Sequence, residues 1–245
     1  MIFEYVKTSW DAYKENFMSF ILASLILWII PSAIALTGIG IVLGSVGISA
    51  FTEMFNQRIM LSRMIYFIPL MINMGILSIF FITASLVYIF LLVGMFGMAA
   101  QSLRGETKFL AIFKFAKNKG LIGILACMAI GIMAFFIFLI IVLGLEIIFS
   151  PYGTIIGMII SSLVIILFSL IFPGIVLDNL NTLKSIKISV SIVKRNYIEM
   201  LSLLLVYLAL SILITLIPIV GLLIVALVVF PMLCISLVLF YKKRK

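Results

Sequence analysis

The sequence contains no histidine and few charged residues. Its 245 residues include only 8 acidic side chains and two cysteines, and charged residues make up 10% of the chain. The lack of histidine removes the commonest general base and the commonest metal ligand. No glycine-rich phosphate loop and no nucleophile elbow is present. We therefore expect no enzyme activity, no cofactor and no metal site.

The two cysteines, Cys127 and Cys234, both lie in long apolar runs. A thiol buried among apolar groups is usually an inert small packing residue. The thiolate that metal binding or disulfide exchange requires is also disfavoured there. The pattern predicts neither a disulfide nor a metal site at these positions.

Hydrophobic residues make up 66% of the chain. An ordinary soluble domain is about half apolar and about a quarter charged. Since about 20 consecutive apolar residues cross a bilayer, the long apolar runs predict an all-α, polytopic transmembrane bundle. The residues 1–245 then form one integral membrane domain. The expected spans are 17–43, 67–99, 120–145, 152–176, 197–217 and 219–241.

The conformation of residues 38–66 is left open by the sequence. The stretch "GIGIVLGSVGIS" at 38–49 is rich in glycine, which favours a loop or a short re-entrant piece over the end of a helix. Residues 50–63 then form the one connection of useful length on the outer side. The next apolar stretch carries Pro69 and Asn73 in its first third and is longer than one bilayer needs, so its outer end should project, tilt or break.

The lysines and arginines are distributed unevenly between the two sides of the predicted bundle. Of the 17 in the chain, all but Arg58 and Arg63 lie in four segments, 1–16, 100–119, 178–196 and 242–245. Positive charge gathers in cytoplasmic loops. We therefore expect a multi-pass protein of the cell membrane with both termini cytoplasmic. The membrane also explains the net charge of +9 better than nucleic acid does, and the acidic residues among the first 16 argue against a cleavable signal peptide.

Three of the basic segments share one residue pattern. Apolar residues stand at positions i, i+4 and i+7, a lysine at i+8 and a second polar residue at i+10. The three sets are Val6, Trp10, Tyr13, Lys14 and Asn16; Phe109, Phe113, Ala116, Lys117 and Lys119; and Ile186, Val190, Val193, Lys194 and Asn196. Such spacing places the apolar residues on one helical face. Each segment is therefore predicted to be an amphipathic helix in the cytoplasmic interface.

The pattern suggests three parallel copies of one unit, at 1–99, 100–177 and 178–241. Each copy would consist of an interfacial helix, a span, an outer turn and a returning span. The alternative is a chance pattern, because any bundle with positive flanks shows some such periodicity. Both readings stay open at this point.

Three stretches carry a resemblance to a known family. They are "SWDAYKENF" at 9–17, "AAQSLRGETKFLAIFKFAK" at 99–117 and "FPGIVLDNLNTLKSIKISVSIVKRN" at 172–196. Together they resemble uncharacterised prokaryotic six-span proteins that are similar to the membrane domain of glycerophosphoryl diester phosphodiesterases. The resemblance implies a membrane domain that sometimes accompanies a soluble enzyme, and no such enzyme domain is expected within these residues.

A few polar and proline residues within or beside the spans are candidate functional positions. Asn73 is expected to form an interhelical hydrogen bond. Asp178 is interpreted as an N-cap of the third interfacial helix, or as a polar group at the membrane boundary. Glu199 is expected to pair with Arg195, four residues earlier. Pro173, followed by glycine, marks the expected break in the fourth span.

Small residues form stripes that allow helices to approach closely. One stripe consists of Gly123, Cys127 and Gly131, and another of Gly40 and Gly44. Their spacing does not distinguish contacts within the chain from those with a second copy or another membrane protein. A homo-oligomer or a membrane protein partner therefore remains open.

We favour a non-catalytic membrane protein that engages anionic lipid headgroups or a partner through its basic interfacial helices. The residues expected to make this contact are Lys14, Lys117, Lys119, Lys194 and Arg195. The alternative is a transporter or flippase for lipids or small apolar solutes, suggested by the repeats and the proline breaks.

Overall fold

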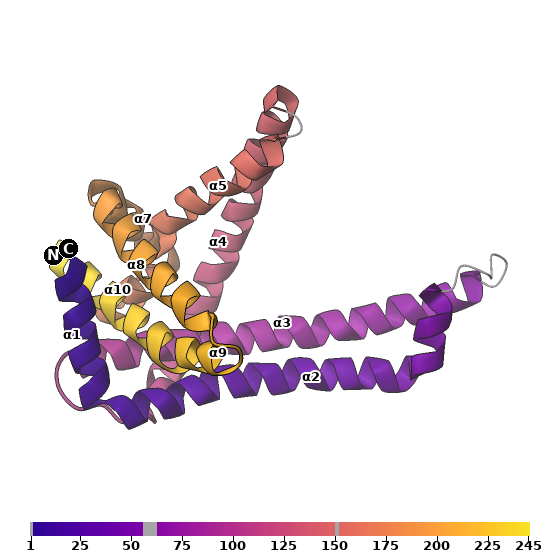
Figure 1. The fold of residues 1–245 in the computed structure, drawn as a ribbon, viewed down its shortest axis with the longest axis horizontal. Coiled ribbons are helices and arrows are strands. Elements are labelled where there is room, and N and C mark those ends of the chain that lie inside the picture. Colours follow the sequence, from indigo (N-terminus) through magenta and orange to yellow (C-terminus); the bar gives the residue numbers. More distant parts are fainter. Residues whose placement is uncertain (1, 56–62, 150–151) are drawn as a thin grey trace. The chain divides into compact units, whose positions relative to one another are not determined.

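The computed structural model describes residues 2–55, 63–149 and 152–245, and no strand occurs among them. The chain divides into two compact units. The larger unit comprises Met1–Leu25 and Ile89–Lys245, and the smaller unit comprises Ile26–Tyr88. Figure 1 shows the helices that make up both units. The expectation of an all-α fold is confirmed for the described residues.

Among the described residues, six helical segments are long and apolar enough to cross a membrane, as the sequence predicted. They are Phe17–Gly44, Met71–Ser102, Ala111–Ile141, Ile156–Asp178, Tyr197–Thr215 and Val220–Arg244. Each is long enough to cross the hydrocarbon core of a bilayer, which needs about 20 residues. This chain is therefore a polytopic membrane protein.

Two of the predicted interfacial segments are separate helices. α1 (Ile2–Glu15) ends before Asn16, where α2 (Phe17–Phe55) begins, and α7 (Thr182–Arg195) ends before Asn196, where α8 (Tyr197–Thr215) begins. In both breaks the asparagine Nδ2 donates a 3.0 Å hydrogen bond to the carbonyl oxygen four residues earlier. A short amide side chain competes in this way with the backbone hydrogen bonds of a helix.

The third predicted interfacial helix is not separate, and this expectation was wrong. α4 (Ala111–Phe149) runs without a break past Lys119, which occupies the position of the two asparagines. The reason lies in the side chain, because the ammonium group of lysine is at the end of a long flexible chain, whereas the short asparagine amide is held close enough to donate to the carbonyl four residues earlier. The amphipathic segment is therefore the first part of a membrane-spanning helix.

The glycine-rich stretch at 38–49, whose conformation the sequence left open, is helical and not a loop or a re-entrant piece. α2 continues through it to Phe55, and α3 (Arg63–Ser102) begins the return. In an apolar medium the backbone groups must be satisfied internally, and a helix achieves this even where glycine is frequent. The rest of the predicted connection, 56–62 with Arg58, lies outside the described residues, as do residues 150–151 of the turn that follows α4.

Two of the returning spans are interrupted. The fourth consists of α5 (Gly153–Ile165), the short 3-10 helix η1 (Ile166–Phe168) and α6 (Ile171–Asp178). The sixth consists of α9 (Val220–Ile224), the π-helical η2 (Val225–Val229) and α10 (Phe230–Arg244). Pro173 and Pro231 follow these interruptions, and a proline deprives the carbonyl four residues earlier of its hydrogen bond. Pro31, by contrast, lies inside α2.

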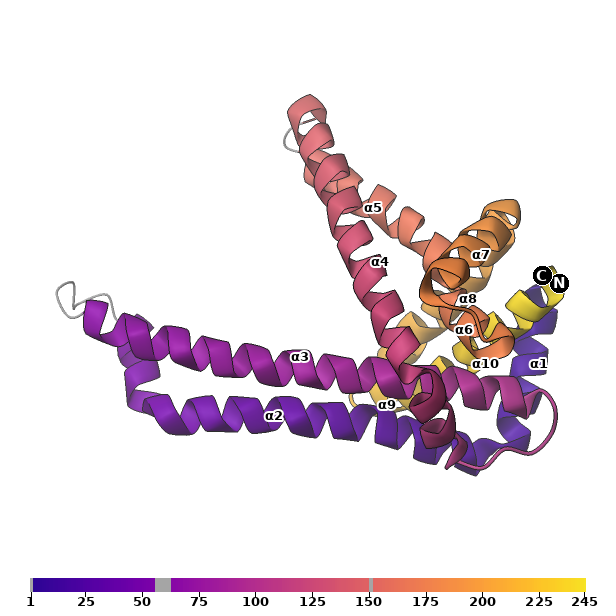
Figure 2. The ribbon, with the colours of Figure 1, turned by 180° about the vertical axis from the view of Figure 1, so that it is seen from behind.

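Hydrogen bonds from α1 and α7 reach both interrupted spans. The Tyr13 hydroxyl donates at 3.0 Å to the carbonyl of Leu227, the group that Pro231 leaves without its helical partner. Ser189 Oγ accepts from the amide of Leu170 at 3.1 Å and donates to the carbonyl of Leu167 at 2.8 Å. Side chains of α1 and α7 therefore form hydrogen bonds with backbone groups at the two interruptions. Figure 2 shows α7 beside α6.

The smaller unit consists of parts of α2 and α3. The rings of Trp28 and Tyr88 lie 5.5 Å apart, and a Cβ built on Gly38 would overlap the side chain of Phe80. Asn73 is buried in this unit. Close contact of the two helices at a glycine is the expected packing of transmembrane segments.

Candidate functional site

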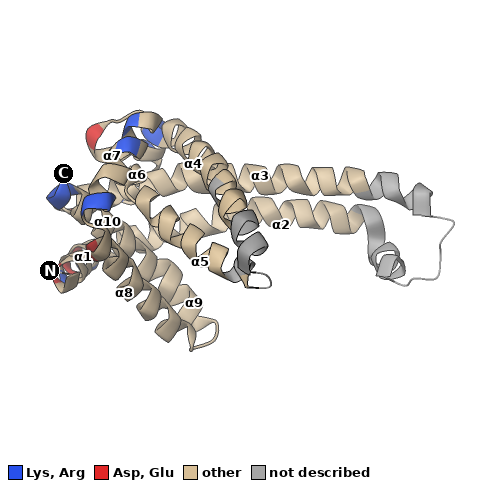
Figure 3. Ribbon diagram, turned by 90° about the horizontal axis from the view of Figure 1, so that it is seen from above, with Lys and Arg blue, Asp and Glu red and all other residues tan. Residues whose placement is uncertain are grey.

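The four basic segments of the chain contact one another in the larger unit. Asn16 Oδ1 accepts a 2.6 Å hydrogen bond from the backbone amide of Thr107, which joins the first segment to the second. The tail joins the first segment through a 2.7 Å ion pair between Lys243 and Glu4. It joins the third through a 2.8 Å ion pair between Lys245 and Asp178. Figure 3 shows charged residues close to the two marked termini, whereas α5 and α9 carry none among their described residues.

Asp178 is not the N-cap of α7, and this expectation was wrong. It is the last residue of α6, and Asn181 occupies the N-cap position of α7 without a side-chain hydrogen bond. The carboxylate accepts a 2.5 Å hydrogen bond from the Tyr241 hydroxyl in addition to the ion pair with Lys245. Two partners from α10 and its C-terminus therefore hold it, because the tertiary fold brings the ends of α6 and α10 together.

Glu199 pairs with Arg244 at 2.5 Å and not with Arg195. The pair is largely buried, and Arg195 is exposed. The sequence spacing suggested a local contact, but the C-terminal turn of α10 lies beside the first turn of α8 in the folded chain. Glu199 therefore ties the tail to the beginning of the fifth span.

The buried residues of the three amphipathic segments recur at equivalent positions. Adding 103 to a residue number in the first segment gives the equivalent residue of the second, and adding a further 77 gives that of the third. Four aligned positions are buried in all three copies. Two lie in the segments themselves: Ser9, Ile112 and Ser189, and Tyr13, Ala116 and Val193. Two lie in the spans that follow: Phe20, Gly123 and Met200, and Ala23, Ala126 and Leu203. The spacing of four and of three residues within each group places its members on one helical face.

The predicted apolar face was only partly correct. Of its three positions, the one at i+7 is buried in every segment, whereas Trp10 and Phe113 at i+4 are exposed. The buried face instead includes the position at i+3, which holds Ser9 and Ser189 in two segments. These serines are buried because they hydrogen-bond to neighbouring spans, a contact that the apolar pattern could not indicate.

Each segment packs against a returning span at an equivalent place. Ser9 contacts Ser236 of α10, with their Oγ atoms 2.6 Å apart. Ser189 contacts Leu170 of the interrupted fourth span. A Cβ built on Gly94 of α3 would overlap the carbonyl of Ile112 in the remaining segment. The contacted positions 236, 170 and 94 each precede the last helical residue of their span by the same number of residues.

The cations predicted to contact headgroups lie on the outside of these segments. Lys14, Lys117, Lys194 and Arg195 are exposed, and Lys119 is half-buried. Within the described part of the chain, none of the five side chains has an ion-pair or hydrogen-bond partner. Large apolar side chains are exposed on the same segments, with 83% of Phe3, 46% of Trp10 and 78% of Leu183 accessible.

Glu4 and Tyr13 of α1 depart from their ordinary pKa values. The hydrogen bond from Lys243 lowers the pKa of Glu4. Burial raises the pKa of Tyr13 to about 12. Glu4 is consequently ionised, and Tyr13 neutral and able to donate its hydroxyl proton to Leu227, across the physiological pH range.

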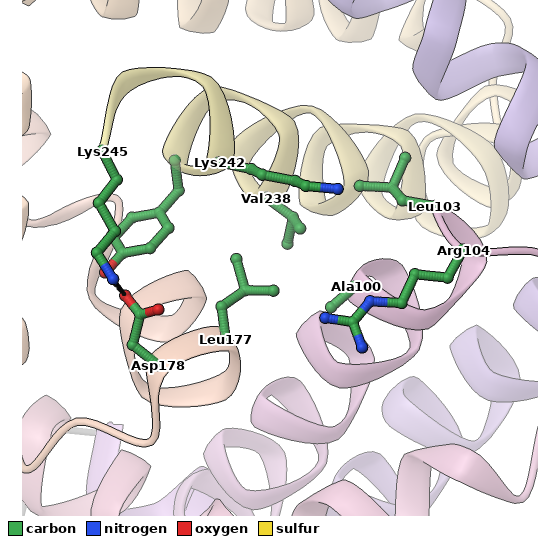
Figure 4. A pocket seen from close by; sticks show the side chains of 9 residues that line it. Ala100, Leu103, Arg104, Leu177, Asp178, Val238, Lys242 and Lys245 are labelled. Carbon is green, nitrogen blue, oxygen red and sulfur yellow. Dashed lines mark hydrogen bonds and ion pairs between the residues drawn. The ribbon is translucent and has the colours of Figure 1, made fainter.

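A cavity of about 190 Å³ lies where the ends of α3, α6 and α10 meet. Its polar lining consists of Arg104, Asp178, Tyr241, Lys242 and Lys245 (Figure 4). Apolar side chains from the same three ends complete it. The sequence did not indicate this site, because its members come from segments about 70 residues apart and share no motif. Only their position directly after three spans could have suggested it.

Among the described residues, no group of three His, Cys, Asp or Glu side chains is arranged to hold a metal ion. Cys127 and Cys234 are free thiols. The polar contacts of the larger unit are instead hydrogen bonds and ion pairs between helices. No family model, curated protein or solved structure matches the chain.

Proposed function

We propose that this chain is a non-catalytic membrane protein whose basic surface segments engage anionic lipid headgroups on the cytoplasmic side. The observation that carries the proposal is the recurrence of Lys14, Lys117 and Lys194. All three are exposed and without a protein partner in the described structure, at equivalent places in three segments. A lysine near an anionic membrane surface contributes about 1 kcal/mol to binding.

The exposed aromatic and aliphatic side chains support the same proposal. Phe3 and Trp10 on α1 would be poorly placed in water, whereas the interface between headgroups and acyl chains favours an apolar body beside a cation. The mutual contacts of the four basic segments are consistent with their lying on one side of the membrane. The excess of positive charge makes that side the cytoplasmic one.

We further propose that the larger unit contains three copies of one structural element. The support is the set of buried positions shared by the three segments and the equivalent contacts at 94, 170 and 236. Each segment packs on the returning span of the preceding copy, and the first packs on that of the last. The resemblance to the family similar to the phosphodiesterase membrane domain remains a prediction beside this architecture.

Transport of lipids or small apolar solutes is the second candidate function. The interruptions at 166–170 and in η2 favour it, because interrupted helices and π segments are frequent at functional sites. Hydrogen bonds from Ser189 and Tyr13 satisfy these interruptions, which favours a structural role. Lipid scrambling or solute flux in proteoliposomes that is lost on changing Pro173 or Asn73 would support transport over our proposal.

Trp10 provides a direct test of headgroup selection. The chain has two tryptophans, so Trp28→Phe leaves Trp10 as the single fluorophore. The variant is reconstituted into phosphatidylcholine vesicles that contain brominated phosphatidylglycerol or, separately, the same fraction of brominated phosphatidylcholine. We expect the brominated phosphatidylglycerol to quench Trp10 fluorescence more strongly, since the cations beside it concentrate anionic lipid.

The triple change of Lys14, Lys117 and Lys194 to Gln should reduce this preference, and the matched triple change to Arg should retain it. High salt should weaken the preference in the parent protein. Equal quenching by the two lipids in the parent, or an unchanged preference in the Gln variant, would overturn the proposal.

A further inference from the structure

The cavity between the ends of α3, α6 and α10 carries more positive than negative charge. Arg104, Lys242 and Lys245 line it, and Asp178 is its one carboxylate. Asp178 is already occupied, because it accepts from Tyr241 at 2.5 Å and pairs with Lys245 at 2.8 Å. The charge of Lys245 is thus balanced within the protein.

The other two cations have no such balance. In the described part of the chain, neither Arg104 nor Lys242 forms an ion pair or a side-chain hydrogen bond. Figure 4 shows their side chains extending over the cavity from opposite sides, Lys242 from α10 and Arg104 from the turn after α3. Two cations facing one small space repel each other, and an anion bound between them would relieve this repulsion.

Two structural explanations account for this arrangement only in part. Helix C-termini attract cations, but each end is equivalent to about half a negative charge and its effect falls off within the last turn. Arg104 lies beyond the end of α3, which is Ser102. The threefold arrangement does not produce the cluster either, since the positions equivalent to Lys242 in the other two copies hold Ala100 and Val176.

We propose that this cavity binds a phosphate group, with Arg104 and Lys242 as its ligands. The planar guanidinium offers two parallel donors that match two phosphate oxygens, and the lysine ammonium adds a compact charge. Asp178, held by Tyr241 and Lys245, lines the opposite part of the cavity. It disfavours anions that extend toward it, unless they present a hydrogen-bond donor there.

The size of the cavity favours a small anion. Its volume of about 190 Å³ is less than the roughly 300–1,000 Å³ of pockets for drug-sized ligands. A phospholipid headgroup and free inorganic phosphate share the required chemistry. The inference rests on the proposed function where it names a lipid headgroup as one source of the phosphate group. It adds one defined binding site to the general attraction of the exposed lysines for anionic lipid.

Isothermal titration calorimetry on the full chain in a non-ionic detergent tests the site. The probes are inorganic phosphate, dihexanoyl phosphatidic acid and, as a neutral comparison, dihexanoyl phosphatidylcholine. We expect saturable binding of one phosphatidic acid per chain and at least tenfold weaker binding of phosphatidylcholine. Comparable affinities for phosphatidic acid and phosphate would identify a free-anion site, and a preference for phosphatidic acid would identify a headgroup site.

The double variant Arg104→Gln, Lys242→Gln should bind phosphatidic acid at least tenfold more weakly. The matched variant Lys114→Gln, Lys187→Gln removes the same charge from exposed lysines that do not line the cavity, and should stay within twofold. Equal losses in both variants, or no saturable binding in the parent protein, would overturn the site. If the phosphate site fails this test while Trp10 quenching still shows the preference for phosphatidylglycerol, the proposed function stands. Failure of the site and failure of the proposed function are therefore distinguishable. A thermal unfolding midpoint measured on each variant without ligand shows that it is folded.

Discussion

Ser9 and Ser236, 227 residues apart in the chain, share a hydrogen bond of 2.6 Å between their hydroxyl groups. Ser236 also lies 2.6 Å from the Tyr207 hydroxyl, which donates to the carbonyl of Met232 at 3.2 Å. These three side chains are buried and come from α1, α8 and α10. The network therefore joins the first helix of the chain to the last two spans.

Replacing Ser236 with Ala should destabilise the protein by about 0.5–2 kcal/mol, because Ser9 and Tyr207 each lose a buried partner. The thermal unfolding midpoint in detergent measures this loss. Ser202→Ala is the matched control, since Ser202 is bonded only to its own helix and should shift the midpoint little. A double-mutant cycle of Ser9→Ala and Ser236→Ala should show coupling, and additive effects would contradict the network.

Gly94 and Gly131 should respond in opposite directions to the same substitution. A Cβ on Gly94 would overlap the carbonyl of Ile112, whereas one on Gly131 would meet no atom within 4 Å. Gly94→Ala should therefore cost about 1–3 kcal/mol through overpacking. Gly131→Ala should be neutral or stabilise its helix by up to about 1 kcal/mol. Thermal unfolding compares the two, and a Gly94→Ala protein as stable as the parent would refute the close approach of α3 to α4.

Asn16 and Asn196 occupy equivalent breaks but should differ in importance. Asn16 is buried and also accepts from the Thr107 amide, whereas Asn196 is half-buried and donates only to Ile192. Asn16→Ala leaves a buried amide without a partner and should cost about 1–3 kcal/mol. Asn196→Ala should cost about 0.5–1.5 kcal/mol, the usual contribution of one hydrogen bond. Equal or reversed losses in unfolding experiments would contradict these environments.

The Glu4–Lys243 pair should make stability depend on pH in the acid range. The pKa of Glu4 is lower in the folded chain than its ordinary value of 4.5, so the pair stabilises the fold above that value. The contribution is lost as the pH falls through the folded pKa. Glu4→Gln should unfold at a slightly lower temperature than the parent at pH 7, and the difference should shrink progressively as the pH falls below 4.5. A difference that stays constant with falling pH would show that Glu4 acts by something other than its charge.

Much of the membrane architecture was predictable from the sequence, because it depends on local composition. Each span needs a continuous apolar run of a set length, and the six runs correspond to six helices. The helices α1 and α7 were also predictable from their apolar spacing. The third amphipathic segment was mistaken for a separate helix, since its lysine at 119 replaces the asparagine that makes the break elsewhere.

The partners of the polar side chains were not predictable in the same way. Glu199 and Asp178 both have nearby residues in the sequence that offer plausible local contacts, yet both are bound by the C-terminal turn of α10 and the last residue. The cavity lined by Arg104 and Lys242 is likewise assembled from ends of distant helices. Spacing along a chain says nothing about which helix ends meet.

The sequence by itself determined the medium of this protein, the positions of its six apolar runs and the helices α1 and α7, but not all of their buried faces. Hydrophobicity and helical period depend only on the residues of a short stretch, so they can be recognised without knowing how that stretch packs in the fold. The tertiary structure alone decided that Ser9 meets Ser236, that Tyr13 bonds the carbonyl freed by Pro231, and that three helix ends enclose a cationic cavity. These contacts depend on how whole helices pack, a choice made by the summed fit of many side chains and not by any one segment.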